Sequence, residues 1–299
     1  MTATERFECS AVSASNGEAL TGTASRLKLW LMVEQPGPWG HDALVDSGFP
    51  PDVGSRLRDL GRRLGVRVLL IKRRDRLQGP RRCFLAYTGV HDRRIRTLDI
   101  ADPEELLALD VPSLVETRFE TVGEPFDEPL FLVCTHGKHD QCCARYGAPA
   151  FRALAGFENA WECTHIGGDR FAGNIVCFPH GMYFGRVAPS EAARTVESYA
   201  AGVIILERYR GRSAFPRAVQ AAEEHIRWQV GLTGVDDLNL ESHQAYGSTH
   251  IVRFTGPDGA PHVAEVEVDR LDPRLLTCKA THPHAPRSFT VRLLETVED

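Results

Sequence analysis

The chain has 299 residues, of which 42% are hydrophobic and 25% charged, and its formal net charge is −5 at pH 7. These values are ordinary for a globular protein, so they exclude extensive disorder. The acidic balance argues against a nucleic acid as the main partner. The length allows two domains or one large one.

The start of the chain lacks the apolar segment that directs secretion, and the longest apolar run, 200–206, is too short to span a bilayer. We therefore expect a cytoplasmic protein with no membrane partner. In that reducing compartment the eight cysteines are expected to be thiols or metal ligands rather than disulfides. Three of them, Cys9, Cys83 and Cys278, lie outside any motif and are expected to be packed as small apolar side chains.

The first third of the chain has the periodicity of a small α/β unit. The pattern predicts, in order, a strand at 27–33, a helix at 51–64, strands at 66–71 and 82–88, and a helix at 103–109. Proline in the first turn and glycine after the last residue mark the ends of the helix at 51–64.

A similar order of elements follows in the middle of the chain. The predicted strands are 129–133, 160–163, 174–178 and 182–187, and the predicted helices are 143–154 and one capped by Ser190. The last third differs, because a helix at 218–230 precedes short strands at 250–254, 262–268 and 288–294.

These patterns predict an α/β (α+β) fold in three segments. Residues 1–120 form an N-terminal α/β module, 121–210 form a second module, and 211–299 form a helix with antiparallel strands. The two βαββα-like orders suggest related modules, each with a small central sheet, although no sequence identity between them is visible.

Two Gly-containing loops carry the residues suited to chemistry. The first runs from Cys134 to Cys143, and we expect it to fold back so that both sulfurs reach one metal. In the second, His165 and Asp169 flank a Gly-Gly pair and could reach a second metal. These residues predict an iron–sulfur cluster held by Cys134, Cys143, His165 and Asp169. Cys163 and Cys142 are the alternative fourth ligands, whereas His136 and His139 are expected beside the metal or exposed.

These loops resemble the sucrase/ferredoxin-like family, and the likeness extends over most of the chain. The matching residues are Cys134, His136, Asp140, Cys143, His165, Gly167, Gly168, 171–174, 183–187 and 209–213. The resemblance implies a thioredoxin-like [2Fe–2S] ferredoxin module at 121–210. It also implies two cysteine and two histidine ligands, and the second histidine position is occupied here by Asp169.

The leading functional prediction is therefore a [2Fe–2S] electron carrier rather than an enzyme with its own substrate, and no glycosidase activity is expected. One alternative is a structural or regulatory zinc protein that uses the same ligands. The other is a thiol-redox protein without a cluster, working through Cys142 and Cys143.

A basic stretch at 62–96 is the predicted docking surface for a separate reductase or electron acceptor, because no Gly-rich nucleotide fingerprint follows a strand. A solvated sheet edge is the alternative interpretation. The basic residues are Arg62, Arg63, Arg67, Lys72, Arg73, Arg74, Arg76, Arg81, Arg82, Arg93, Arg94 and Arg96.

Overall fold

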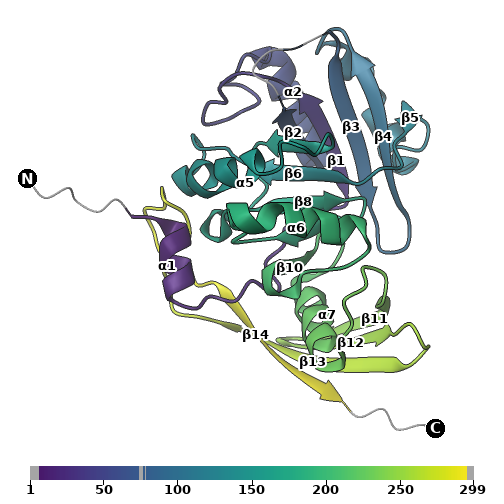
Figure 1. Cartoon of the computed structure of the whole chain (residues 1–299). Helices are drawn as coiled ribbons and strands as arrows, with labels where there is room; N and C mark the ends of the chain where they lie inside the picture. The colour runs from purple at the N-terminus through teal and green to yellow at the C-terminus, as the bar shows by residue number, and fades with distance from the viewer. Residues whose placement is uncertain (1–6, 74–76, 78, 295–299) are drawn as a thin grey trace, which may run out of the picture.

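The computed structural model describes residues 7–73, 77 and 79–294, so Arg74 and Arg76 of the basic stretch lie outside the described residues. It has a mixed α/β architecture, which confirms the predicted fold class (Figure 1). A ten-stranded sheet has the order β10-β9-β8-β6-β7-β2-β1-β3-β4-β5, and a four-stranded sheet has the order β11-β12-β13-β14. Within the described residues no helix is both long and apolar enough to cross a membrane.

The first half of the large sheet is a βαβ unit followed by a hairpin. β1 (Leu29–Glu34) pairs in parallel with β2 (Val66–Lys72), and α2 (Pro51–Leu64) connects them. β3 (Arg81–Thr88) pairs antiparallel with the other edge of β1, and β4 (Arg93–Ile100) pairs with β3. A parallel pair needs such a helical crossover, and this accounts for the position of α2.

The second half repeats this strand order. β6 (Leu130–Cys134) pairs in parallel with β7 (Ala160–Cys163) and antiparallel with β8 (Ile175–Phe178), and β9 (Met182–Phe184) extends the sheet beyond β8. The connection between β6 and β7 contains a π-helical turn η1 (Cys143–Gly147) and then α5 (Ala148–Arg152). The two predicted modules thus have the same topology.

The two halves share one sheet, in contrast to the separate small sheets that the sequence suggested. β2 and β7 pair antiparallel through Ile71 opposite Cys163 and Lys72 opposite Glu162. The segment boundaries at 120 and 210 stay a prediction.

The sheet curls, so that one face of each half packs against the other. Trp30 on β1 lies 5.0 Å from Phe178 on β8, ring centroid to centroid, although three strands separate them. Phe84 on β3 contacts Trp161 on β7 at 5.7 Å. The helices α2, α5 and α6 (Pro189–Ala200) cover the opposite face, where they close two further apolar clusters. Burial of these apolar faces is the main favourable contribution to the fold.

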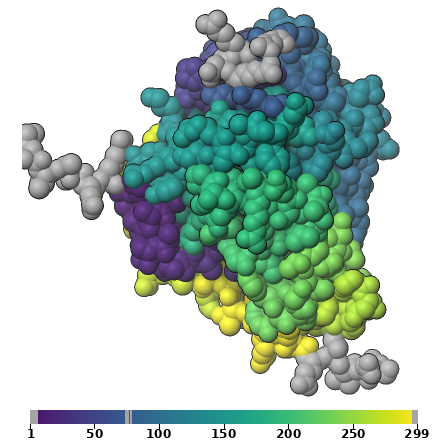
Figure 2. All heavy atoms as spheres, in the orientation of Figure 1, coloured from purple at the N-terminus to yellow at the C-terminus, as the bar shows by residue number. Residues whose placement is uncertain are grey.

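The remaining elements frame these layers. They are α1 (Cys9–Ser15), α3 (Glu105–Ala108), α4 (Val111–Glu116), β5 (Glu124–Pro125), η2 (Asp169–Phe171), α6 (Pro189–Ala200), η3 (Leu206–Arg208), β10 (Tyr209–Arg212), α7 (Arg217–Val230), β11 (Asn239–Tyr246), β12 (Thr249–Thr255), β13 (Pro261–Arg270) and β14 (Arg287–Leu294). The segment between β13 and β14 returns to α1, so an N-terminal helix and a C-terminal connection adjoin on one side of the molecule (Figure 2).

α7 carries a buried charge network that joins the large sheet to the C-terminal segment. Glu223 Oε1 lies 2.9 Å from Arg212 Nε and 3.1 Å from Arg227 Nη2, and Tyr209 donates its hydroxyl to Oε2 at 2.8 Å. Burial opposes ionisation of the carboxyl, but the two guanidinium groups hold the pKa of Glu223 below its usual range. The network therefore stays ionised inside the protein.

Replacing Glu223 with glutamine should lower the free energy of unfolding by about 3–5 kcal/mol, because two buried guanidinium groups lose their counter-charge. Urea denaturation followed by circular dichroism measures this. Glu224→Gln is the matched control, since this more exposed neighbour accepts a hydrogen bond from Trp228 that a glutamine side-chain oxygen can also accept. Its effect should stay within about 0.5 kcal/mol. Equal effects of the two substitutions on the free energy of unfolding would contradict the role of Glu223 as the counter-charge of the buried guanidinium groups.

Candidate metal centre

The parallel pair β6 and β7 delivers both loops to the same end of the sheet. Cys134 and Cys163 are opposite each other in the last register position of the two strands. Thr135 donates its backbone N–H to the carbonyl of Cys163 at 3.2 Å, and Cys134 donates to the carbonyl of Asn174 at 3.1 Å. These bonds fix the backbone at the point where the first loop begins.

A close helix approach then returns the first loop to Cys134. Cys143 begins the π-helical turn, and its N–H donates to the carbonyl of Asp140 at 3.1 Å. A Cβ atom on Gly147 would collide with the carbonyl oxygen of Cys134. Only glycine therefore allows this turn to pack so closely behind the strand end.

Two glycines shape the second loop as expected. Gly167 and Gly168 have φ angles of +98° and +81°, in the left-handed region that glycine adopts without strain. The guanidinium of Arg210 fills the space that a side chain at position 168 would need. It also donates to the carbonyl of Gly167 at 3.3 Å and to Asn174 Oδ1 at 2.7 Å, which anchors the loop between His165 and Asp169.

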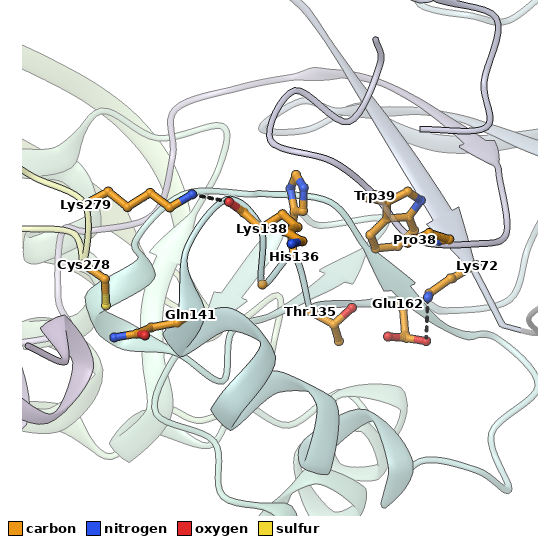
Figure 3. A pocket seen from close by; sticks show the side chains of 11 residues that line it. Pro38, Trp39, Lys72, Thr135, His136, Lys138, Gln141, Glu162, Cys278 and Lys279 are labelled. Carbon is orange, nitrogen blue, oxygen red and sulfur yellow. Dashed lines mark hydrogen bonds and ion pairs between the residues drawn. The ribbon is translucent and has the colours of Figure 1, made fainter. Parts of the chain in front are cut away.

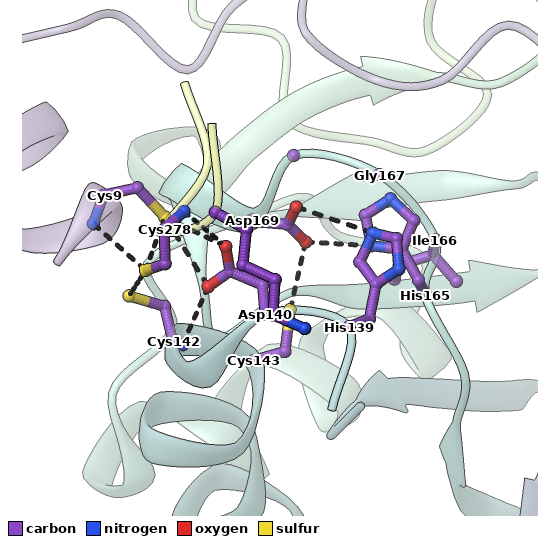
Figure 4. A network of polar contacts seen from close by, with 12 residues as sticks. Cys9, His139, Asp140, Cys142, Cys143, His165, Ile166, Gly167, Asp169 and Cys278 are labelled. Atoms are coloured by element: carbon purple, nitrogen blue, oxygen red, sulfur yellow. Dashed lines mark hydrogen bonds and ion pairs between the residues drawn. The ribbon is translucent and has the colours of Figure 1, made fainter. Parts of the chain in front are cut away.

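Three predicted ligands meet at one point. Donor atoms of Cys134, Cys143 and His165 all lie within 4.8 Å of one another. Asp169 lies beside them, with Oδ1 2.8 Å from His165 Nδ1 and accepting a hydrogen bond from Cys143 Sγ at 3.2 Å (Figure 4). The contact with His165 is an ion pair without hydrogen-bond alignment, and Nδ1 is buried without a hydrogen-bond partner. Two thiols, an imidazole and a carboxylate at this spacing are a donor set that suits a metal ion.

The charges at this centre are unevenly distributed. A hydrogen bond from Cys143 and the neighbouring His165 hold the pKa of Cys134 well below its usual range despite burial. The same bond to Cys134, together with burial, raises the pKa of Cys143 well above its usual range. Burial disfavours the imidazolium of His165, but Asp169 and Cys134 outweigh it and raise the pKa to about 9. In the metal-free centre these shifts favour the thiolate at Cys134, the thiol at Cys143 and the imidazolium at His165.

The other two histidines of the first loop flank the centre. The ring of His139 stacks on that of His165 at 3.8 Å between centroids, and burial lowers the pKa of His139 to about 4. His136 points away and contacts the carbonyl of Gly40 through Nε2 at 2.6 Å. His139 also belongs to a second potential donor group with His165 and Asp169.

The two alternative fourth ligands do not join this donor group within the described residues. Cys163 lies among apolar side chains, and burial raises its pKa well above the usual range. Cys142 points to a different group formed with Cys9, Asp140 and Cys278. The ligand set itself stays a prediction.

The group formed by Cys9, Asp140, Cys142 and Cys278 was missed by the sequence prediction, which treated Cys9 and Cys278 as isolated packed cysteines. Instead, Cys278 Sγ lies 3.5 Å from Cys9 Sγ and 3.4 Å from Cys142 Sγ. The two cysteines are 269 positions apart, so spacing carried no signal. The presence of Asp140 and Cys142 in the first loop was the available clue.

A cleft of about 620 Å³ lies on the other side of the first loop (Figure 3). Its lining includes Trp39, Lys72, His136, Lys138 and Lys279. Lys72 pairs with Glu162 at 3.9 Å and lies 4.9 Å from the centre of the Trp39 ring. The first loop therefore separates the metal-ligand group from a basic cleft.

Several arginines of the basic stretch at 62–96 have local partners. Arg82 pairs with Asp99 at 2.5 Å, Arg94 with Asp92 at 2.7 Å, and Arg93 with Asp236 at 3.0 Å. Arg67 donates to the carbonyl of Ile166 at 3.0 Å and so supports the second loop. Docking of a partner on this stretch stays a prediction.

The fold and the site together define a mixed α/β protein with a buried thiolate–imidazole centre between two strand-end loops. The family model described as Sucrase/ferredoxin-like matches residues 20–211, more than half of the chain. The chain belongs to this family, which confirms the resemblance predicted from the sequence. No solved structure matches the chain.

The curated relatives are fungal proteins named Altered inheritance of mitochondria protein 32. The protein from Meyerozyma guilliermondii is 29% identical over 109 residues, which cover 32% of this chain and 39% of the relative. A Saccharomyces cerevisiae protein is 33% identical over 111 residues, covering 32% of this chain and 35% of the relative. The match thus spans well under half the length of these relatives.

These names contradict the predicted [2Fe–2S] electron carrier. The relatives are named for the inheritance of mitochondria and not as ferredoxins, and the family name alone does not establish an iron–sulfur protein. The donors of Cys134, Cys143 and His165 lie within 4.8 Å of one another, a spacing that a single four-coordinate ion can satisfy.

Asp169→Asn should lower the pKa of His165 from about 9 towards the ordinary value of about 6.5 in metal-free protein, because the carboxylate charge is lost. Imidazole ¹⁵N–¹H NMR across the alkaline range measures this. The raised pKa stabilises the fold fully below pH about 6.5, and this contribution is lost as pH rises through about 9. Glu162→Gln, on β7 and paired with Lys72, should leave the titration unchanged; an unchanged titration in Asp169→Asn would refute the pairing.

Proposed function

We propose that this protein binds a single zinc ion through Cys134, Cys143 and His165, with Asp169 as the fourth ligand, in a structural or regulatory role. The observation that carries the proposal is the convergence of two thiol sulfurs and an imidazole nitrogen within 4.8 Å. Zinc favours four ligands of this kind in a tetrahedral arrangement. Catalytic zinc keeps an open position, whereas four protein ligands close the site.

The proposal of Asp169 as the fourth ligand is supported by its position beside this group. It is 3% exposed, and its Oδ1 atom contacts both Cys143 and His165. A buried carboxylate needs a cation or hydrogen bonds, and a divalent ion beside the thiolate supplies the cation. With two thiolates and one carboxylate, the bound site would carry one net negative charge.

The expected effect of zinc is to fix the loops at the strand ends. The ligands come from the end of β6, the first residue of η1, the loop after β7 and the first residue of η2. One ion would therefore join four chain positions that are otherwise held by loop hydrogen bonds. Binding energy at such a site adds directly to the free energy of folding.

Metal analysis of purified protein tests this proposal. Cys134→Ser and His165→Ala should each lower the zinc content by about one equivalent relative to wild type, because each removes one of the four proposed ligands of a closed structural site. Cys177→Ala is the matched control, since Cys177 is buried on β8 and belongs to no donor group within the described residues. Cys163→Ala should also leave the zinc content unchanged.

Two results would overturn the proposal. One is iron with acid-labile sulfide, in place of zinc, in protein purified without oxygen. The other is unchanged zinc in both Cys134→Ser and His165→Ala while the variants remain folded by circular dichroism. A disulfide between Cys134 and Cys143 in protein that has never contained zinc would instead support the thiol-redox alternative.

Zinc binding at this site should release about two protons at pH 7.5. The lowered pKa of Cys134 favours its thiolate before zinc binds, whereas the raised pKa values of Cys143 and His165 favour protonated groups that must lose their protons to bind. Calorimetric titrations in buffers of different ionisation enthalpy measure the release. The quantity to compare is the number of protons released by wild type and by His165→Ala. A difference near zero would contradict the charges assigned to the metal-free centre.

A further inference from the structure

We infer that Cys9, Cys142, Cys278 and Asp140 form a second, separate zinc site that ties both ends of the chain to the first loop. The donor atoms of these four residues all lie within 4.8 Å of one another. Three thiols and one carboxylate are a complete tetrahedral ligand set. Cys9 begins α1, Asp140 and Cys142 lie at the end of the first loop, and Cys278 lies between β13 and β14.

The sulfur spacing fits a shared ion. Cys278 Sγ is 3.4 Å from Cys142 Sγ and 3.5 Å from Cys9 Sγ (Figure 4). Zinc–sulfur bonds of about 2.3 Å at tetrahedral angles place sulfurs about 3.8 Å apart, so a small outward shift would admit the ion. Asp140 completes the group, with each carboxylate oxygen 3.7 Å from Cys9 Sγ.

The surroundings of Asp140 favour a bound cation. Its side chain is fully buried, and within the described residues it forms no ion pair. The carboxylate accepts the backbone N–H of Cys278 at 2.7 Å and that of Cys142 at 2.9 Å. These bonds hold it facing the sulfurs, but they supply no counter-charge. A buried carboxylate in that state is costly, and a divalent ion removes the cost.

A backbone donor also serves the sulfurs. The N–H of Cys9 donates to Cys278 Sγ at 3.4 Å. Three thiolates and one carboxylate around zinc leave two net negative charges, as in four-cysteine structural sites, and N–H donors offset such charge. A disulfide is the rival use of this group, but it would join two sulfurs and leave the third thiol beside an uncompensated carboxylate.

The two sites are separated by the direction of adjacent side chains. Cys142 points to Cys9 and Cys278, whereas Cys143 points to Asp169, so neighbouring residues serve different donor groups. No residue is shared between the second group and the ligands of the proposed first site. The second inference therefore stands or falls independently of the first.

The consequence of this site is attachment of the chain ends. Hydrogen bonds also hold this region. Ser10 donates its hydroxyl to the carbonyl of Ala172 at 3.1 Å, and Gln141 donates to the carbonyl of Phe7 at 2.9 Å. Lys279 donates to the carbonyl of Lys138. An ion held by Cys9 and Cys278 would link α1 and the segment at 271–286 to the first loop from inside. The site is thus a structural clip between the two ends of the chain.

Zinc analysis of single and paired variants tests the inference. Cys278→Ser and Cys9→Ser should each remove about one equivalent of zinc, and each combined with Cys134→Ser should remove about two. Cys278 is partly exposed, so its replacement by serine should leave the fold intact by circular dichroism. Cys177→Ala again serves as the matched control. Unchanged zinc in folded Cys278→Ser would overturn the second site whatever the result for Cys134→Ser.

Hydrogen exchange gives a second, independent readout. Loss of zinc in Cys278→Ser should speed amide exchange at least tenfold at 9–15 and 271–286, whereas Cys134→Ser should leave these segments protected. If the four residues only pack together without a metal, a zinc chelator should leave amide exchange of the wild-type protein unchanged in these segments. That result would overturn the inference. A Cys142–Cys278 disulfide in protein purified without oxygen or reductant, found by mass spectrometry, would overturn it as well.

Discussion

The parallel pairing of β6 with β7 is the interaction on which the site depends. Parallel strands end at the same edge of a sheet, so the loops that follow Cys134 and Cys163 emerge side by side. The hydrogen bond from Thr135 to the carbonyl of Cys163 continues the pairing one step beyond the strands. Without this register, residues about thirty positions apart would not converge on one point.

The buried guanidinium of Arg210 holds the second loop in place. It donates to the backbone carbonyls of Thr23 and Gly167 and to Asn174 Oδ1. Its guanidinium carbon lies 4.9 Å from the centre of the Phe171 ring and 5.3 Å from that of Tyr183. A planar group with several fixed donors can hold these partners at once, whereas a lysine ammonium at this position could not. The orientation of His165 and Asp169 thus rests on a residue from β10.

The sequence correctly predicted helices and strands whose start, end and periodicity are set by residues within the segment itself. The helix at 51–64 and the strand at 160–163 occur with the predicted bounds, because proline, glycine and apolar periodicity act within the segment itself. β4 and β11 were missed: β4 is rich in arginine, and most of β11 is exposed. Both are strands because of their partners, β3 for the first and β12 for the second. The π-helical turn at Cys143 also replaces the expected start of a regular helix.

Long-range packing accounts for the rest of what the sequence did not reveal. The curl of the sheet depends on contacts such as Trp30 with Phe178, which no local pattern encodes. The convergence of Cys134, Cys143 and His165 was foreseeable because two glycine-containing loops followed short apolar strands. The position of Cys9 and Cys278 was not foreseeable, since it requires the return of the C-terminal segment to α1.

The segment from Asp140 to Cys143 connects the two donor groups mechanically. The carbonyl of Asp140 accepts the N–H of Cys143, while its carboxylate accepts the N–H of Cys142. Asp140 therefore sets the backbone orientation at both cysteines, although its own side chain faces only one group. A rotation of this backbone that brought Cys142 nearer to Cys143 would break both of these hydrogen bonds. The buried carboxylate would then lose one of its two backbone donors and keep the N–H of Cys278. The divergence of two adjacent thiols is thus maintained by one buried acidic residue, and this keeps the two groups chemically distinct.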